Sequence, residues 1–265
     1  MPFGQLLARL RRRFGGPGNS EIMGRIRRLE RDLKGLRRLV HRASPVTDEG
    51  SFDVKELAEY HAATSSAAYF SRHLHGKPTF ANRDALLAFA LDSLGRPPSF
   101  PLEFGVYSGA SINVIADHIG ADTRVYGFDS FEGLPEDWRG TMTKGRFAVG
   151  SLPAVRSNVE LIKGWFSDTL APFRETVLAG RTIDFIHMDC DLYSSTRTVF
   201  EEIGSLLAED AVIVFDEFFN YPGWEHHERR AFEEFLVSSG RDFDHLACVP
   251  THQQVAVRLK RRQSA

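Results

Sequence analysis

Hydrophobic residues in the C-terminal two thirds of the chain come in short runs, separated by longer stretches in which apolar positions recur with helical spacing. Short apolar runs that alternate with helical segments are typical of a parallel sheet covered by helices on both faces. We therefore predict an α/β fold of the Rossmann-like, doubly wound type, with a mostly parallel seven-stranded sheet. The predicted strands are Ser99–Phe104, Arg124–Phe128, Val159–Ile162, Ile183–Met188, Ala211–Phe215, His245–Val249 and Gln254–Leu259.

A helical segment precedes the predicted sheet. Asn82 is the predicted N-cap of an apolar helix at residues 85–94, and the Gly and Pro residues at 95–98 end that helix. We assign residues 46–98 to a helical lid that closes over a site and excludes water. The aromatic residues expected to close over the site are Tyr60, Tyr69, Phe70 and Phe80.

The first 45 residues contain an amphipathic pattern. Spacings of three and four predict a helix with one apolar seam and basic residues on its other faces. The seam consists of Ile22, Ile26, Leu29, Leu33, Leu36 and Val40. Three interpretations stay open: a short coiled coil between subunits, an interfacial helix attracted to anionic lipid, and a helix packed on its own domain. The predicted organisation is a basic helical arm at 1–45, the lid at 46–98 and a ligand-binding domain at 99–265, in a homo-oligomer.

Composition narrows the class of protein. With 42% hydrophobic and 26% charged residues, the chain is neither disordered throughout nor collagen-like. The net charge of -2 gives no general argument for nucleic-acid binding, although it hides a basic arm on an acidic body: residues 1–45 hold 12 Lys and Arg against 3 Asp and Glu. Two cysteines are too few for a disulfide framework, and no apolar stretch approaches the roughly 18 residues of a membrane span. We expect a cytoplasmic protein, with membrane association through residues 1–45 as the alternative.

A glycine-containing loop follows the first predicted strand. The sequence EFGVYSG at residues 103–109 places an acidic residue before two glycines, and glycines let a ligand approach the backbone closely. A dinucleotide fingerprint would need G-x-G-x-x-G, and Glu103 would repel a pyrophosphate but could pair with an amino group. The loop therefore favours a ligand that is cationic at this point over NAD, with a purely structural turn as the alternative.

The next two strands end in further candidate ligand contacts. Asp129 lies 26 positions after Glu103, where a carboxylate can accept both hydroxyls of a ribose; the alternative is that Asp129 caps the next turn. Trp165 and Phe166 follow the third strand and offer aromatic rings for an adenine, although core packing explains Phe166 equally well.

Four carboxylates follow the fourth and fifth strands: Asp189, Asp191, Asp216 and Glu217. Because such side chains repel one another when they lie together, a divalent cation such as Mg²⁺ is the natural partner, and its preferred ligands are hard oxygens. Carboxylates that face solvent or cap helices are the alternative. His187 points to the same side of its strand as Asp189 and Asp191, but a lone strand histidine is more often a core residue than a base.

Two pairs of histidines carry less information. His73 with His75, and His226 with His227, have no third metal ligand nearby in the sequence. We interpret both pairs as surface or lid residues.

With these motifs, the chain resembles class I S-adenosylmethionine-dependent methyltransferases, and specifically the macrocin O-methyltransferase family of bacterial sugar O-methyltransferases. The resemblance covers roughly residues 55–260. The segments that carry it are EFGVYSG at 103–109, GFDSFEGLP at 127–135, KGWF at 163–166, HMDCDLYSST at 187–196 and YPGWEH at 221–226. The cofactor segments would fit many methyltransferases, whereas the D-x-D-L-Y-x-S-T run is much narrower.

The resemblance implies S-adenosylmethionine and Mg²⁺ as cofactors. Glu103 and the glycine loop would hold the methionine end, Asp129 the ribose, and Trp165 or its neighbours the adenine. The full set of implied cofactor residues is Glu103, Gly105, Tyr107, Ser108, Gly109, Ser111, Asp129, Ser130, Gly164, Trp165 and Asp189. The implied metal ligands are Asp189, Asp216 and Glu217, where the family usually has Asp-Asp in place of the last two.

The expected reaction is an SN2-like transfer of the methyl group to a sugar hydroxyl of a small molecule or glycan. Asp191 is the first choice for the general base, followed by Asp189 and then His187. A metal-dependent methyltransferase for catechols or phenols is the nearest alternative, because its acceptor also presents two adjacent oxygens. A non-catalytic protein with this fold, recruited through its basic arm, is an alternative of a different class, and an NAD-dependent oxidoreductase fits least well.

Overall fold

The computed structural model describes residues 51–262 together with Gly24, Arg28 and Arg31. Those three residues are helical and exposed, whereas the six residues of the predicted apolar seam lie outside the described part of the chain. The chain divides into two compact units, residues 1–61 and 62–265. No helix within the described residues is both long and apolar enough to cross a membrane.

Seven strands form one sheet in the order β3-β2-β1-β4-β5-β7-β6. Strands β1 to β5 run parallel to one another, and β7 is antiparallel to both β5 and β6. The strands are β1 (Pro101–Phe104), β2 (Val125–Asp129), β3 (Val159–Lys163), β4 (Ile183–Met188), β5 (Leu207–Phe215), β6 (Arg241–Cys248) and β7 (Val255–Arg261). The carboxyl ends of β1 to β5 therefore meet along one edge of the sheet, which is where such folds bind their ligands.

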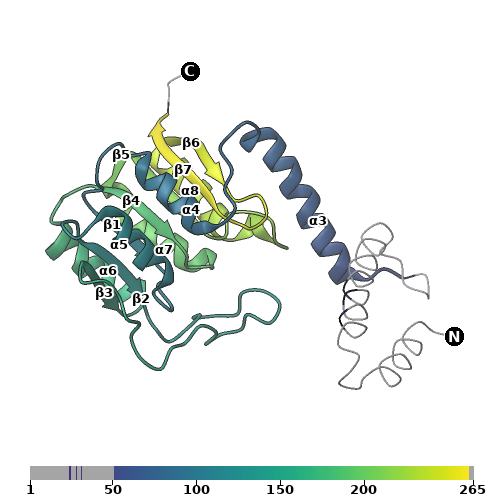
Figure 1. Cartoon of the computed structure of the whole chain (residues 1–265), viewed down its shortest axis with the longest axis horizontal. Helices are drawn as coiled ribbons and strands as arrows, with labels where there is room; N and C mark the ends of the chain where they lie inside the picture. Colours follow the sequence, from purple (N-terminus) through teal and green to yellow (C-terminus); the bar gives the residue numbers. More distant parts are fainter. Residues whose placement is uncertain (1–23, 25–27, 29–30, 32–50, 263–265) are drawn as a thin grey trace. The chain divides into compact units, whose positions relative to one another are not determined.

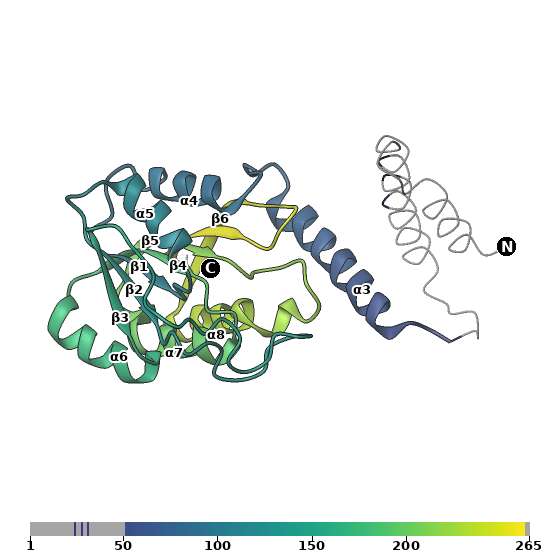
Figure 2. The same cartoon turned by 60° about the horizontal axis from the view of Figure 1, so that its bottom comes forward.

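Helices cover both faces of this sheet (Figures 1 and 2). In Figure 2, α4 and α5 lie along one face, and α6, α7 and α8 lie along the other. The helices are α3 (Val54–Tyr69), α4 (Arg83–Asp92), α5 (Ala110–Ile119), α6 (Phe166–Phe173), α7 (Tyr193–Ile203) and α8 (Glu228–Ser239). Short π-helical turns extend α3 (Phe70–Leu74) and α6 (Arg174–Leu178), and two 3₁₀ turns lie at Gly204–Leu206 and Trp224–His226.

Alternation along the buried strands divides the core into two layers. In β5, Val212 and Val214 pack with α4 and α5, whereas Ile213 and Phe215 pack with α6, α7 and α8. Successive side chains of a strand point to opposite faces, so a continuous apolar run is what a strand buried on both sides requires. The Rossmann-like fold predicted from these runs is confirmed.

Strand ends and one helix cap follow the sequence pattern closely. Asn82 Oδ1 accepts a hydrogen bond from the Ala85 backbone N–H at 2.9 Å, so the predicted N-cap is confirmed. The largest differences are at β5 and β6, which begin four residues earlier than predicted, at Leu207 and Arg241. Both extensions contain charged, partly exposed residues, which do not read as part of a buried run.

The segment assigned to a lid lies largely within the second compact unit. Leu86, Leu87 and Leu91 of α4 are buried against α5 and the sheet, so α4 is a layer of the core. Tyr69 is also buried, and its hydroxyl lies 2.7 Å from Nε2 of His245. Neither this tyrosine nor any of the other three aromatic residues expected to close over a site lines the pocket described below.

The glycine loop after β1 lies directly against the start of the loop after β4. Gly105 has φ +90°, and a Cβ atom at this position would collide with the backbone carbonyl oxygen of Asp189. The Asp189 backbone N–H in turn donates to the carbonyl of Phe104 at 2.8 Å. Glycine is therefore required here both by backbone conformation and by the close approach of two loops.

We predict that Gly105→Ala destabilises the protein by about 4 kcal/mol or more, because it combines steric overlap with a left-handed backbone. Gly240→Ala is the matched control, since Gly240 also has positive φ (+66°) but no atom within 4 Å of the added Cβ. This control is expected to cost about 1 kcal/mol. Urea unfolding of both variants measures the difference, and equal losses would contradict the close-approach argument.

Candidate active site

A pocket of about 600 Å³ opens at the carboxyl edge of the parallel strands. Its walls come from the residues that follow β1 to β5 and from the β2–β3 loop, residues 130–158. Ten predicted site residues line it: Gly105, Tyr107, Asp129, Ser130, Gly164, Trp165, Asp189, Asp191, Asp216 and Glu217. Five do not: Glu103, Ser108, Gly109, Ser111 and His187.

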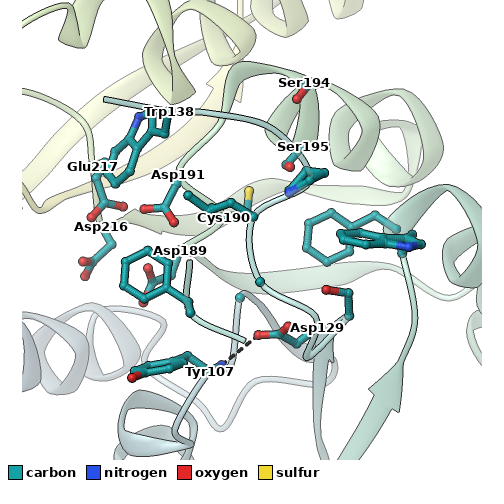
Figure 3. Close-up of a pocket in the computed structure, with 18 of the residues that line it drawn as sticks. Tyr107, Asp129, Trp138, Asp189, Cys190, Asp191, Ser194, Ser195, Asp216 and Glu217 are labelled. Atoms are coloured by element: carbon teal, nitrogen blue, oxygen red, sulfur yellow. Dashed lines mark hydrogen bonds between the residues drawn. The ribbon is translucent and has the colours of Figure 1, made fainter. Parts of the chain in front are cut away.

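Asp129 organises the glycine loop. Its Oδ2 atom accepts hydrogen bonds from the backbone N–H groups of Val106 and Tyr107 at 2.9 and 2.8 Å, and its Oδ1 atom accepts one from Phe131 at 2.6 Å. The Tyr107 bond is the dashed line in Figure 3. A carboxylate has about four acceptor positions, so one position on Oδ1 is left for a ligand. Asp129 thus caps the turn and also faces the pocket.

Three residues predicted to contact ligands form a buried network behind the pocket wall. Glu103 accepts a hydrogen bond from the Ser111 hydroxyl at 3.0 Å, and its second oxygen lies 3.2 Å from Nδ1 of His187. All three side chains are buried. Their geometry suits positioning of the strand ends rather than direct contact with a ligand.

Four carboxylates gather on one side of the pocket, and we name them the acid cluster: Asp189, Asp191, Asp216 and Glu217 (Figure 3). Within it, ligand atoms of Asp189, Asp191 and Glu217 lie within 4.8 Å of one another. A second group, with the same spacing limit, consists of His187, Asp189 and Asp216. The first group offers only hard oxygen ligands and faces the pocket, as a Mg²⁺ site requires.

Asp216 and Asp189 both face the positive charge of Arg83, and Asp216 also faces His187. Arg83 Nη1 lies 3.6 Å from Oδ1 of Asp216 and 3.2 Å from Oδ2 of Asp189. His187 Nε2 lies 3.7 Å from Asp216 Oδ1, an ion-pair distance too long for a good hydrogen bond. Burial opposes charge on both partners, yet their pairing lowers the pKa of Asp216 and raises the pKa of His187 to about 10. Asp216 is therefore less available to a cation than the other members.

In the remaining carboxyls, burial and neighbouring negative charge outweigh any compensation, which for Asp189 is the contact with Arg83 at 3.2 Å. Burial, and then the charge of Asp216, raise the pKa values of Asp189 and Glu217 well above normal and that of Asp191 to about 7. Two oxygens of the acid cluster, Oε2 of Glu217 and Oδ1 of Asp216, are buried without a hydrogen-bond partner within residues 51–262. Buried, unpaired carboxylate oxygens at this spacing fit a divalent cation. The geometry thus groups Asp189 and Glu217 with Asp191, where the resemblance implied Asp216.

Backbone strain is concentrated around the pocket. Asp191 has φ +63°, a left-handed conformation that is rare for residues other than glycine, and the pocket residues Tyr107 and Phe147 share it. The conformation turns the Asp191 carboxylate towards Glu217 (Figure 3). Strain of this kind costs of order 1–3 kcal/mol and persists at sites where geometry is over-determined by the surroundings.

Glu228, the first residue of α8, is a site residue that the sequence patterns did not identify. It is fully buried, and its two carboxylate oxygens accept hydrogen bonds from the backbone N–H groups of Cys190 at 3.3 Å and Glu217 at 3.2 Å. Burial and the charge of Asp191 raise the pKa of Glu228 to about 8. Glu228 ties the loops after β4 and β5 together. A glutamate in the first turn of a helix is so common that its sequence position gives no signal.

The β2–β3 loop forms the wall that sequence reasoning missed. It has no regular secondary structure, but backbone hydrogen bonds between Leu134 and Arg146 fold it back on itself. Its pocket-lining residues include Trp138, Arg139, Met142 and Phe147. The loop carries neither helical nor strand periodicity, so nothing in its pattern predicted its place over the site.

Residues 102–218 match a family model described as a methyltransferase domain. This segment contains the glycine loop, Asp129 and the whole acid cluster. This part of the chain is therefore similar to methyltransferase domains. The predicted resemblance to S-adenosylmethionine-dependent methyltransferases is thereby confirmed, and the fold agrees with it.

Two relatives of the methyltransferase domain are informative. A protein of Streptomyces olivaceus named 8-demethyl-8-(2,3-dimethoxy-alpha-L-rhamnosyl)-tetracenomycin-C 4'-O-methyltransferase is 32% identical over 145 residues, which cover 46% of this chain and 53% of that protein. The chain thus spans about half the length of this curated relative. The crystal structure of CalS11, a calicheamicin methyltransferase, shares the fold at 22% identity and a TM-score of 0.54, covering 86% of this chain and 92% of CalS11.

We predict that Glu228→Ala lowers the free energy of unfolding by about 2–5 kcal/mol, because it leaves two buried N–H groups unpaired. Glu228→Gln is expected to cost less, since one amide oxygen can still accept. The matched control is Glu233→Ala on the same helix, which removes only an exposed ion pair with Arg229 and should cost about 0.5 kcal/mol or less. Urea unfolding measures all three, and a wild-type midpoint for Glu228→Ala would refute the tie between the loops.

Proposed function

We propose that the protein transfers a methyl group from S-adenosylmethionine to a sugar hydroxyl with the help of a divalent cation, Mg²⁺. The observation that carries the proposal is the adjacency of the acid cluster to the glycine loop within one pocket of a methyltransferase domain. The acid cluster suits a metal-bound acceptor, and the glycine loop suits the methyl donor.

The residues that follow β1, β2 and β3 offer contacts for each part of S-adenosylmethionine, the methyl donor. In the proposed complex, the methionine end lies against the backbone of Gly105 and Tyr107, and the ribose binds the free position of Asp129 Oδ1. The adenine lies against Trp165, beside Gly164. These assignments are supported by the fact that all five residues line the same pocket.

Asp189, Asp191 and Glu217 would hold the cation, on the strength of their spacing and of the unpaired Glu217 oxygen. A bound metal would lower the pKa of the acceptor hydroxyl and help to orient the acceptor. Arg83 and His187 lie at ion-pair distance from Asp216 and compensate part of the charge of that carboxylate.

The chemical step moves one methyl group and one proton. The acceptor oxygen attacks the methyl carbon, a C–O bond forms as the C–S bond breaks, and the electron pair goes to sulfur, giving S-adenosylhomocysteine. The hydroxyl proton goes to the oxygen of Asp191 that does not ligate the cation, and the strained Asp191 backbone presents this carboxylate to the pocket. Orientation of donor and acceptor can supply roughly 7–11 kcal/mol of the barrier reduction at its upper limit.

Polar side chains in the pocket support a sugar acceptor over a catechol. Ser194, Thr198 and Arg139 line the same pocket as the acid cluster, whereas a planar diphenol needs an apolar slot. The printed name of the Streptomyces olivaceus relative describes O-methylation of a rhamnosyl group, which supports the same class of acceptor. Oligomerisation and a role of residues 1–45 at membranes stay predictions.

We predict that the purified protein methylates a sugar acceptor in the presence of Mg²⁺, and that Asp189→Asn lowers kcat at least 100-fold without changing the affinity for S-adenosylhomocysteine. Asp189 acts on the acceptor and its metal, so the donor site should be unaffected. Release of S-adenosylhomocysteine measures turnover, and calorimetric titration measures binding.

The same experiment separates the alternatives. Turnover of catechols but not of sugars would replace the sugar assignment, and cofactor binding without transfer to any acceptor would favour a non-catalytic protein. Full turnover of Asp189→Asn without added metal would overturn the metal mechanism.

A second prediction concerns the metal ligands. Glu217→Gln is expected to weaken Mg²⁺ binding at least tenfold, because it removes an unpaired buried carboxylate oxygen. Asp216→Asn, matched in chemistry and adjacent in the chain, is expected to change the affinity less than threefold, because Asp216 lies outside the group of Asp189, Asp191 and Glu217 and has ion-pair contacts with both Arg83 and His187. Calorimetric titration with Mg²⁺ measures both, and the opposite order would assign the ligand role to Asp216.

A further inference from the structure

We propose that Arg139 forms a subsite for an anionic group, a phosphate or a carboxylate, on the acceptor. The inference rests on the proposed function and specifies the acceptor as a charged sugar derivative. The contact between Arg139, in the β2–β3 loop, and this anionic group would determine specificity for the acceptor.

The guanidinium group of Arg139 is fixed in place by three neighbours. Its central carbon lies 4.0 Å from the ring centroid of Trp138 and 4.1 Å from that of Tyr221. Its Nη2 atom donates a hydrogen bond to Oε1 of Gln253 at 3.0 Å. Two aromatic faces and one hydrogen bond therefore hold the guanidinium plane before any ligand arrives.

Most of the hydrogen-bonding capacity of Arg139 is unused. A guanidinium has five N–H donors, and only the Gln253 bond is formed within the part of the chain that the structure describes. No carboxylate in that part lies within the 4.0 Å of an ion pair, in contrast with Arg83, which contacts both Asp189 and Asp216. Arg139 is thus a preorganised cation without a partner anion at contact distance.

The position of this cation matters because Arg139 lines the same pocket as the acid cluster. A stacked guanidinium with a free edge matches the two oxygens of a carboxylate or phosphate in a bidentate arrangement. An acceptor that placed its hydroxyl at the acid cluster could present an anionic substituent to Arg139. The competing role is electrostatic: burial and the charge of Asp216 raise the pKa of Asp191, Arg139 offsets part of this rise, and that role needs no ligand.

The test compares acceptors that differ only in the anionic group. L-Rhamnose 1-phosphate is paired with methyl L-rhamnoside, and methyl glucuronide with methyl glucoside, so that the two pairs distinguish phosphate from carboxylate recognition. Each is titrated calorimetrically into protein saturated with S-adenosylhomocysteine and Mg²⁺, which makes the readout independent of turnover. The variant is Arg139→Gln. The matched control is Arg146→Gln, in the same loop and 5.4 Å from the Phe147 ring but not lining the pocket.

The expected result is that one anionic probe binds at least tenfold more tightly than its neutral partner to the wild type and to Arg146→Gln. Arg139→Gln is expected to lose that difference while its affinity for S-adenosylhomocysteine stays the same. Equal binding within both pairs by the wild type, or an advantage that persists in Arg139→Gln, would overturn the proposal.

If no sugar binds, inorganic phosphate replaces it under the same conditions. Loss of phosphate binding in Arg139→Gln alone supports the subsite, and phosphate binding that is absent or unchanged refutes it. Failure to bind S-adenosylhomocysteine would refute the proposed function separately, because that titration does not involve Arg139.

Discussion

Mutual repulsion among carboxylates that cannot be fully solvated is the constraint on which the site depends. The acid cluster and Glu228 bring five carboxylates to the ends of β4 and β5 and the start of α8. Arg83 and His187 compensate only part of this charge, and the two oxygens of Glu228 are occupied by backbone N–H groups. The cluster is therefore under electrostatic strain that a divalent cation would relieve, and the close packing of the loops after β1, β4 and β5 prevents the carboxylates from moving apart.

The sheet brings these carboxylates to the same edge as the other residues of the site. Five parallel strands deliver their carboxyl ends to one edge, so the glycine loop, Asp129 and the acid cluster face one pocket although they are distant in sequence. The β2–β3 loop supplies a further wall of this pocket, where Arg139 adds positive charge. A pocket with a donor side, an acidic side and a preorganised cation can orient a polar acceptor at several points, which is what a transfer reaction between two bound molecules requires.

The sequence predicted those features that depend on short-range pattern. Short, mostly apolar runs located all seven strands, because the sheet is covered by helices on both faces. Acidic residues directly after the strands located the acid cluster. Side-chain direction was harder to predict: Glu103 and His187 belong to a buried network because their strand positions point into the core rather than the pocket. The wall of the site was missed, since the β2–β3 loop is shaped by backbone hydrogen bonds and by contacts of Trp138 and Arg139 with Tyr221, a residue more than 80 positions away.

The acid cluster and the glycine loop together form the proposed metal-assisted methyl-transfer site. Anomalous diffraction tests this proposal, with crystals grown in the presence of S-adenosylhomocysteine and of Mn²⁺ as a substitute for Mg²⁺. We expect a manganese peak between Asp189, Asp191 and Glu217, with the cofactor sulfur in the same pocket and the adenine beside Trp165. Manganese bound elsewhere, or a cofactor outside this pocket, would contradict it.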